Sequence, residues 1–156
     1  MAGIPASLRL SEEEIDALMR SEARVRIATL GPGARINLTP MTFGWANGKV
    51  YIFGRGQKVA NLRRNATATV LLDVGDAWRD LQGVMMHGTA RVLETAAQEE
   101  ADVGLSAARL NLGAKHGLRE AGEIAPYPAT ASGRSRRWIV FTPDDVVSWN
   151  NRRLPP

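Results

Sequence analysis

The stretch INLTPMTFGWANGKVYIFGRGQKVANLRRNATATVLLD, residues 36–73, contains most of the signals that decide the fold. Two apolar runs are joined by Asn47 and Gly48, the pair best suited to the positive backbone dihedrals of a type I′ hairpin turn. The second run ends in the glycine-arginine-glycine segment 54–56, which a short basic helix and a further apolar run follow. The stretch therefore predicts a hairpin, a glycine loop, a short helix and another strand.

The first strand of this stretch changes its inward phase. Ile36 and Leu38 alternate with polar neighbours, but after Thr39 and Pro40 the apolar positions resume one residue out of step at Met41. A one-residue slip in a period-two pattern predicts a β-bulge, where proline is tolerated because it has no N–H to lose from the ladder. We therefore expect a kinked strand whose backbone is partly free.

The rest of the chain adds more strands than helices. Ser11 followed by Glu14 forms a capping box, which predicts an amphipathic N-terminal helix. Further strands are expected at residues 24–30, 81–94, 137–142 and 146–149, and a helical region at residues 96–122 that Gly104 and Gly113 weaken. The pattern predicts one domain over residues 1–156, mainly β with minor α, containing six or seven antiparallel strands in a closed or half-closed barrel with short flanking helices.

Composition excludes several classes of chemistry. The 156 residues contain no cysteine and only two histidines, so thiol nucleophiles, iron-sulfur clusters and histidine-rich metal cages are not expected. No apolar run is long enough to cross a membrane and no signal peptide is evident, so we expect a cytoplasmic protein without a membrane partner. The net charge of +4 suits a small phosphorylated ligand. Aromatic residues are not interleaved with basic ones as nucleic-acid stacking platforms require, so no nucleic-acid partner is expected.

The glycine loop has the properties of an anion site. Gly54 and Gly56 allow close approach of the backbone to a ligand, and the following helix directs its free N–H groups toward the same place. Arg55 and Lys58 add two full positive charges there. The alternative from spacing alone is an ordinary glycine turn followed by a solvated basic helix.

The order of these segments resembles the pyridoxamine 5′-phosphate oxidase-like superfamily of split β-barrels. Members of that superfamily show a Thr-Pro step, a Lys-x-x-x-Leu-x-x-Asn segment and a later Val-x-x-x-Gly strand. In this chain the matching residues are Thr39, Pro40, Lys58, Leu62, Asn65, Val84 and Gly88. The resemblance covers most of residues 24–94 and returns at residues 137–153.

The resemblance implies a homodimer that holds FMN or the deazaflavin coenzyme F-420 at its interface and acts on a small organic molecule. Arg55, Gly56 and Lys58 would bind the cofactor phosphate, with Asn61 as a polar neighbour. The backbone of Thr39, Pro40 and Met41 would contact the ring system. The implied activity is hydride transfer between the cofactor and the substrate.

Two departures from the superfamily pattern argue against vitamin B6 oxidation. Gln57 stands where the true oxidases have an arginine, and Gly83 stands where they have a glutamine. A reductase or oxidase of another conjugated substrate is therefore expected, and no catalytic side chain is assigned because the cofactor supplies the chemistry. His87 is more often a solvent-facing or interface residue than a proton donor. The alternative is a non-catalytic carrier or sensor that holds a flavin or heme on the same fold.

Overall fold

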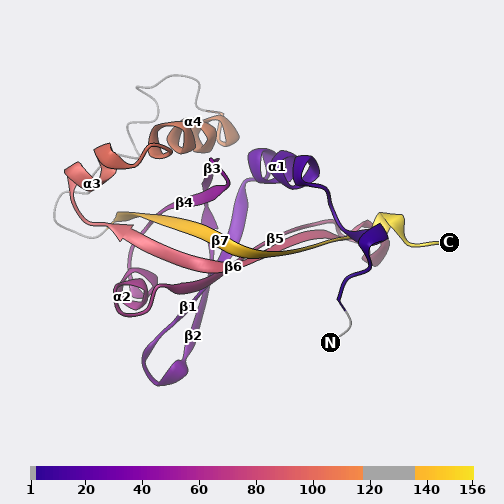
Figure 1. Cartoon of the computed structure of the whole chain (residues 1–156), viewed down its shortest axis with the longest axis horizontal. Helices are drawn as coiled ribbons and strands as arrows, with labels where there is room; N and C mark the ends of the chain where they lie inside the picture. Colours follow the sequence, from indigo (N-terminus) through magenta and orange to yellow (C-terminus); the bar gives the residue numbers. More distant parts are fainter. Residues whose placement is uncertain (1–2, 118–135) are drawn as a thin grey trace.

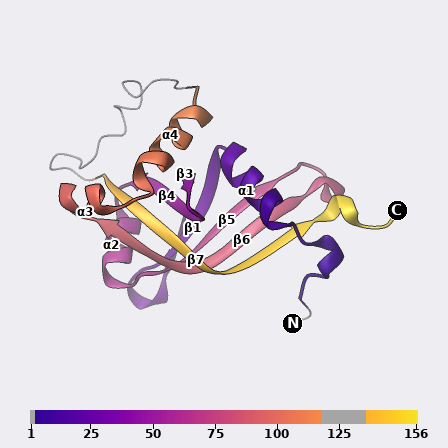
Figure 2. The same cartoon turned by 45° about the horizontal axis from the view of Figure 1, so that its top comes forward.

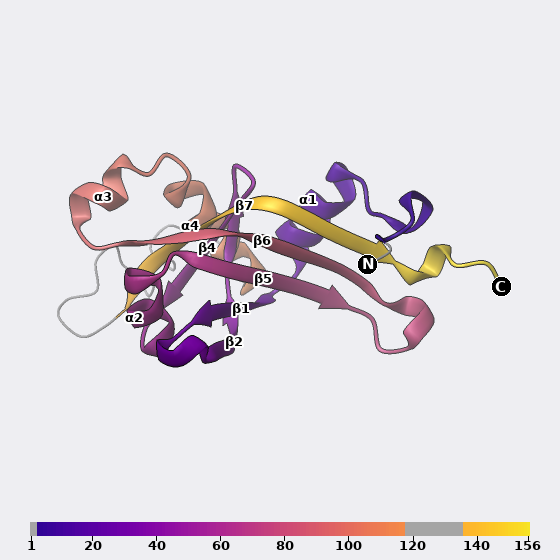
Figure 3. The ribbon, with the colours of Figure 1, turned by 60° about the horizontal axis from the view of Figure 1, so that its bottom comes forward.

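One antiparallel sheet of seven strands forms the centre of the computed structural model, which describes residues 3–117 and 136–156 (Figure 1). Neighbouring strands follow the order β2-β1-β5-β6-β7-β4-β3. The strands are β1 (Arg24–Leu30), β2 (Ile36–Thr42), β3 (Gly44–Ala46), β4 (Lys49–Gly54), β5 (Thr67–Val74), β6 (Gln82–Leu93) and β7 (Arg137–Asn150). Figure 3 shows β5, β6 and β7 side by side along the molecule, with β1 and β2 lying across them. The sheet curls into a half-barrel, which confirms the predicted fold class.

Short helices flank this sheet. The α-helices are α1 (Glu12–Ser21), α2 (Gln57–Arg64), α3 (Ala96–Ala101) and α4 (Leu105–Lys115). Ser11 caps α1 and forms the predicted capping box with Glu14. Figures 1 and 2 place α1, α3 and α4 along one side of the sheet, whereas α2 lies beside the hairpin of β1 and β2. No helix of the described residues is long and apolar enough to span a membrane.

The tight turn between β3 and β4 is the one predicted from the sequence. Asn47 and Gly48 have φ values of 52° and 69°, both in the left-handed region that this turn requires. Gly44 then pairs with Tyr51 and Ala46 with Lys49 across the hairpin. The hairpin forms one end of the sheet, while β2 forms the other.

The predicted bulge at Thr39 and Pro40 is wrong. β2 pairs with β1 without a register shift, and Pro40 lies opposite Arg26. The interruption falls instead at Phe43, where the chain leaves β1 and begins to pair with β4. The sequence pattern suggested a bulge because apolar residues such as Ile36 and Leu38 are expected to point inward. In the structure both side chains point outward, and Asn37, Thr39 and Met41 face inward without interruption.

Two further boundaries differ from the expectation. The two predicted C-terminal strands are one strand, β7, and its register with β6 shifts between His87 and Gly88. The predicted helical region divides at Asp102 to Gly104 into α3 and α4, as the glycine there suggested, whereas Gly113 remains inside α4. Residues 118–122 of that expectation lie outside the described part of the chain.

The core has two parts. One cluster fills the concave side of the half-barrel and includes Ile27, Phe43, Ile52, Val70 and Phe141. The other lies beneath α3 and α4, and its members include Tyr51, Leu93, Leu105, Leu112 and Trp138. Because β4 contributes to both clusters, its C-terminal end and the loop that follows are held from two sides.

Candidate functional site

The loop between β4 and α2 is shaped by its glycines. Gly56 immediately precedes α2 with φ 80° and ψ −148°, a conformation that residues with a side chain rarely adopt. No side chain caps the helix, so the N–H groups of its first turn have no side-chain partner in the described residues. The positive end of the helix dipole is therefore available to an anion at this loop.

Lys58 and Arg55 add charge to the same loop. The Nζ of Lys58 donates a hydrogen bond of 2.9 Å to the backbone carbonyl of Arg55. Burial of the half-exposed Lys58 ammonium, together with the nearby charge of Arg55, lowers the pKa of Lys58 below its ordinary value. Neither residue forms an ion pair with a carboxylate of the described chain. The loop therefore presents positive charge that no acidic side chain in the described part of the chain neutralises.

Two of the predicted site residues pack around Gly54. A Cβ at Gly54 would lie 3.4 Å from Cδ of Lys58 and 3.5 Å from Cε of Met41. Met41 belongs to β2, and Lys58 belongs to α2. The structure thus brings the predicted ring-contacting strand and the predicted phosphate-binding helix together at one point.

The inward face of β2 carries polar atoms without partners. Asn37, Thr39 and Met41 are half-buried on this face, whereas Pro40 is exposed on the opposite face. Oδ1 of Asn37 and Oγ1 of Thr39 are buried and form no hydrogen bond with the described residues. Buried polar atoms are rarely left in this state, and a ligand is one way to satisfy them. β2 also has a strand neighbour on only one side among the described strands, so its other backbone edge is free.

Asn61 is fully buried and already has protein partners. Its Nδ2 donates to Oγ1 of Thr29 at 3.0 Å, and its Oδ1 accepts from Nε2 of Gln57 at 2.7 Å and from a guanidinium nitrogen of Arg64 at 3.1 Å. The amide therefore ties α2 to β1 and orients Gln57. A contact between Asn61 and a cofactor phosphate stays a prediction.

A cavity of about 430 Å³ separates α2 from the turn that joins β1 to β2. Its lining includes Arg35, Asn37, Gln57 and Asn61. This volume lies within the range of small-molecule sites, about 300–1,000 Å³. The sequence analysis did not identify Arg35 and Asn37 as candidate site residues. Both alternate with Thr39 along the chain, so this spacing could have placed them on the same face of the strand. Arg55, Gly56, Lys58, Thr39 and Met41 do not belong to this lining.

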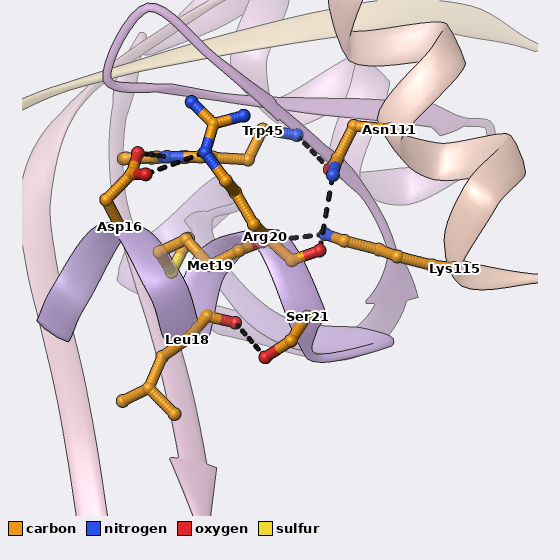
Figure 4. A network of polar contacts seen from close by, with 8 residues as sticks. All are labelled: Asp16, Leu18, Met19, Arg20, Ser21, Trp45, Asn111 and Lys115. Atoms are coloured by element: carbon orange, nitrogen blue, oxygen red, sulfur yellow. Dashed lines mark hydrogen bonds and ion pairs between the residues drawn. The ribbon is translucent and has the colours of Figure 1, made fainter. Parts of the chain in front are cut away.

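Asn111 of α4 holds the chain just beyond β2. Its Oδ1 accepts the backbone N–H of Trp45 at 2.9 Å, and its Nδ2 donates to the carbonyl of Arg20 at 3.2 Å (Figure 4). The indole N–H of Trp45 donates to Asp16 at 2.7 Å, and this bond, followed by that from Arg20, lowers the pKa of Asp16. These contacts fix α1, α4 and β3 to one another.

Lys115, one turn after Asn111, completes this attachment. Its Nζ donates to the carbonyls of Met19 at 2.8 Å and Phe43 at 3.2 Å, and lies 3.3 Å from the centroid of the Phe43 ring. Burial lowers the pKa of Lys115 to about 7, although Glu22 opposes the shift. Since Phe43 directly follows β2, Lys115 anchors the end of the strand that carries Thr39 and Met41.

Comparison with known proteins places this geometry in a family. The sequence matches the profile described as pyridoxamine 5′-phosphate oxidase over residues 11–150. Curated proteins gave no match. Among solved structures, a conserved hypothetical protein of Mycobacterium tuberculosis is similar with a TM-score of 0.81 and 23% identity, over 99% of this chain and 95% of that one.

Two other similar structures have ligands in their names. A FAD-binding protein of Mesorhizobium loti has a TM-score of 0.64 and 17% identity, over 89% of this chain and 94% of its own. The heme storage protein HutZ of Vibrio cholerae has a TM-score of 0.64 and 11% identity, over 89% of this chain and 96% of its own. At these identities the likeness establishes a shared fold. Because the family profile covers most of its length, the chain belongs to the pyridoxamine 5′-phosphate oxidase family.

Proposed function

We propose that the chain is an oxidoreductase that binds a phosphorylated flavin-type cofactor, FMN or coenzyme F-420, and uses it to reduce or oxidise a small organic molecule. The observation that carries this proposal is the positive charge of Arg55 and Lys58 at the uncapped start of α2, which no carboxylate of residues 3–117 and 136–156 pairs with. Phosphate dianions are favoured at such a place by the helix dipole and by charge-assisted hydrogen bonds.

The residues present fit such a cofactor. A phosphate would neutralise the half-buried Lys58, while the orphaned oxygens of Asn37 and Thr39 would find hydrogen-bonding partners in the polar groups of a flavin. When bound, the cofactor supplies hydride transfer through its own ring. The protein's part is to hold the phosphate at the loop, to orient the cofactor along β2 and to exclude water. No acid-base pair of side chains is needed for these roles.

The alternative function is a non-catalytic carrier of a flavin or heme. The observation in its favour is the similarity of the fold to that of a heme storage protein. Heme iron needs an axial ligand, most often histidine. His87 lies exposed on β6, where its Nδ1 is 3.0 Å from Oγ1 of Thr69. Neither His87 nor His116 lines the cavity beside α2. The described residues therefore favour a flavin over heme.

Titration with each cofactor tests the proposal. Purified protein should bind FMN or coenzyme F-420 at micromolar concentrations or below, measured by the change in cofactor fluorescence. The bound cofactor should then accept a hydride equivalent from a chemical or enzymatic donor and pass it on. Absence of binding to both cofactors would reject the proposal, and a bound cofactor that cannot turn over would favour the carrier.

The cofactor-binding form is proposed to be a homodimer with the cofactor at the interface. β2 exposes its outward apolar side chains, and Ile36 retains 67% of its accessible surface. Removing such a side chain from water contributes about 1.5–3 kcal/mol. A second copy packed against this strand would cover Ile36 and narrow the open side of the half-barrel.

A further inference from the structure

The cavity of about 430 Å³ beside α2 lies on the same side of the sheet as the candidate cofactor groove. Its lining includes Asn37, which shares the inward face of β2 with Thr39, and Arg35, which precedes β2 in the same alternation. From α2 it is lined by Gln57, the residue directly after Gly56. The cavity therefore reaches from the proposed phosphate loop to the start of β2.

A second cavity, of about 440 Å³, adjoins the first, because Gly31 and Pro32 of the turn between β1 and β2 line both. The second cavity lies at the other end of α2, where Arg64 and Asn65 contribute to its lining. Gln57 and Arg64 are the first and last residues of α2, so they lie about 10 Å apart along the helix axis. Together the two cavities follow α2 from its start to its end.

Each cavity is lined by one arginine that has no acidic partner. Arg35 lines the first cavity and Arg64 the second, and both residues are exposed. Neither forms an ion pair with a carboxylate of residues 3–117 and 136–156. Among the described residues, no aspartate or glutamate belongs to either lining. Guanidinium groups with several N–H donors and no acidic partner are suited to bind carboxylates.

Asn37 adds a requirement for a hydrogen-bond donor in the first cavity. Its Oδ1 is buried and accepts no hydrogen bond from the described residues. Ionised carboxylates only accept hydrogen bonds, so they cannot satisfy this oxygen, whereas the N–H group of an amide can. The cavities therefore suit a chain in which carboxylates alternate with amide links.

We propose that the two cavities bind an amide-linked acidic chain that continues beyond the cofactor phosphate, with its carboxylates on Arg35 and Arg64. Coenzyme F-420 has such a chain of glutamates beyond its phosphate, whereas FMN ends at the phosphate. The residues assigned to the phosphate and to the ring, such as Arg55, Lys58 and Thr39, line neither cavity, so FMN would leave both of them unfilled. The inference rests on the proposed function, because the loop must hold the phosphate, and it assigns F-420 as the cofactor.

Binding of two forms of the deazaflavin tests this inference. The probes are F-420 that carries its chain of glutamates and the same molecule without any glutamate, titrated into the full chain at low salt and followed by fluorescence. Wild type should bind the form with glutamates at least about tenfold more tightly, and the double variant Arg35→Gln, Arg64→Gln should lose most of this preference. Arg63→Gln is the matched control, because it removes the same charge from α2 at a residue that is paired with Glu94 and lines neither cavity.

Equal affinities of wild type for the two forms, or a preference that the double variant retains, would overturn the inference. Binding of FMN or of the form without glutamates, with no gain from the glutamates, rejects only the acidic-chain site and leaves the proposed function standing. Tighter binding of FAD than of either deazaflavin would show that the cavities accept a nucleotide, and would also overturn the inference. Absence of binding by FMN and by both deazaflavins rejects the proposed function, and this inference with it.

Discussion

Lys58 holds its ammonium half-buried beside the positive charge of Arg55. Burial and the neighbouring charge both lower the pKa of Lys58, so both disfavour its charged form. A structural lysine would ordinarily be paired with a carboxylate or extend into water. A nearby anion would favour the charged form of Lys58, as is expected of a residue that binds phosphate.

Thr39→Val provides a test at the level of one atom. The Oγ1 of Thr39 is buried without a hydrogen bond, so replacing it with a methyl group should leave the free energy of unfolding unchanged or raise it by up to about 1 kcal/mol. The same change should weaken cofactor binding at least threefold, because valine cannot hydrogen-bond to the ligand. Urea unfolding and cofactor titration measure the two effects.

Thr29→Val is the matched control, since Oγ1 of Thr29 accepts a hydrogen bond from buried Asn61. That change should destabilise the chain by about 1–3 kcal/mol, because it leaves the buried Nδ2 of Asn61 without its acceptor. If Thr39→Val destabilises the unliganded chain as much as Thr29→Val does, the hydroxyl of Thr39 has a structural role and is not reserved for a ligand.

The glycines and charges of the loop could be predicted from the sequence because they are neighbours in the chain. The partners of Asn61 could not be, since Thr29 lies 32 positions away and reaches it only through the packing of α2 on β1. The backbone of Thr39, Pro40 and Met41 was predicted to contact the cofactor ring, and this contact stays a prediction. What the sequence pattern did not predict is the regular pairing of β2, which places the side chain of Pro40 on the face opposite Thr39 and Met41, next to Leu38.

At the scale of elements, β6 and β7 meet through an unusual contact. A Cβ added at Gly83 would lie 2.0 Å from Cζ2 of Trp149, so the indole occupies the space that a larger side chain would need. This accounts physically for a glycine at the position where the true oxidases have glutamine. The pairing of Gly83 with Trp149 across the two strands fixes the contact.

Gly83→Ala should therefore lower the free energy of unfolding by about 1–3 kcal/mol, because the indole must move. In a Trp149→Ala background the same alanine should cost less than about 0.5 kcal/mol, since the obstructing ring is absent. Urea unfolding of wild type, the two single variants and the double variant gives the coupling energy between positions 83 and 149. Equal costs of Gly83→Ala in the two backgrounds would show that the indole is not the obstacle.

Lys115, which attaches α4 to α1, is expected to make the free energy of unfolding depend on pH. Burial lowers the pKa of Lys115 from 10.5 to about 7, so between these values the unfolded chain binds more protons than the folded chain. The free energy of unfolding should therefore rise as pH increases from about 7 toward 10.5. Lys115→Met should reduce this rise, and Lys58, whose pKa is also lowered, should account for part of what remains.

Urea unfolding at pH 6.5, 8 and 9.5 measures the slope, with Lys49→Met as the control for loss of a lysine at the start of β4. A slope that Lys115→Met leaves unchanged would contradict the burial of the amine.

Neither β7 nor the attachment of α4 to α1 could be predicted in full from the sequence. The Thr-Pro-Asp-Asp segment indicates a turn locally, yet pairing with β6 on one side carries the strand through it with a register shift.

At the scale of the whole molecule, the half-barrel leaves one side open between its two edges, β2 and β3. The antiparallel class followed from the alternating apolar patterns and the hairpin turn, but the number of strands agreed only because the run from residue 36 is divided into β2 and β3 while the two predicted C-terminal strands are joined in β7. The curl of the sheet, and with it the position of β2 opposite Gly54, depends on contacts between distant segments and was available only from the resemblance.

Ile36→Glu tests the proposed dimer, because it places a charge on the outward face of β2. Light scattering after size exclusion should show a dimer for wild type and a monomer for the variant, with cofactor affinity reduced at least tenfold. Val103→Glu is the control, since Val103 is 92% exposed and lies outside β2. A monomeric wild type that binds cofactor with full affinity would contradict the shared site.

The most direct test of the account compares FMN with riboflavin, which lacks only the phosphate, in wild type and in the double variant Arg55→Ala, Lys58→Ala. Wild type should bind FMN at least tenfold more tightly than riboflavin, a difference of about 1.4 kcal/mol or more. The double variant should bind the two nearly equally, because its loop no longer recognises the phosphate. A preference for FMN that the double variant retains in full would contradict the central claim that this loop is the anion site.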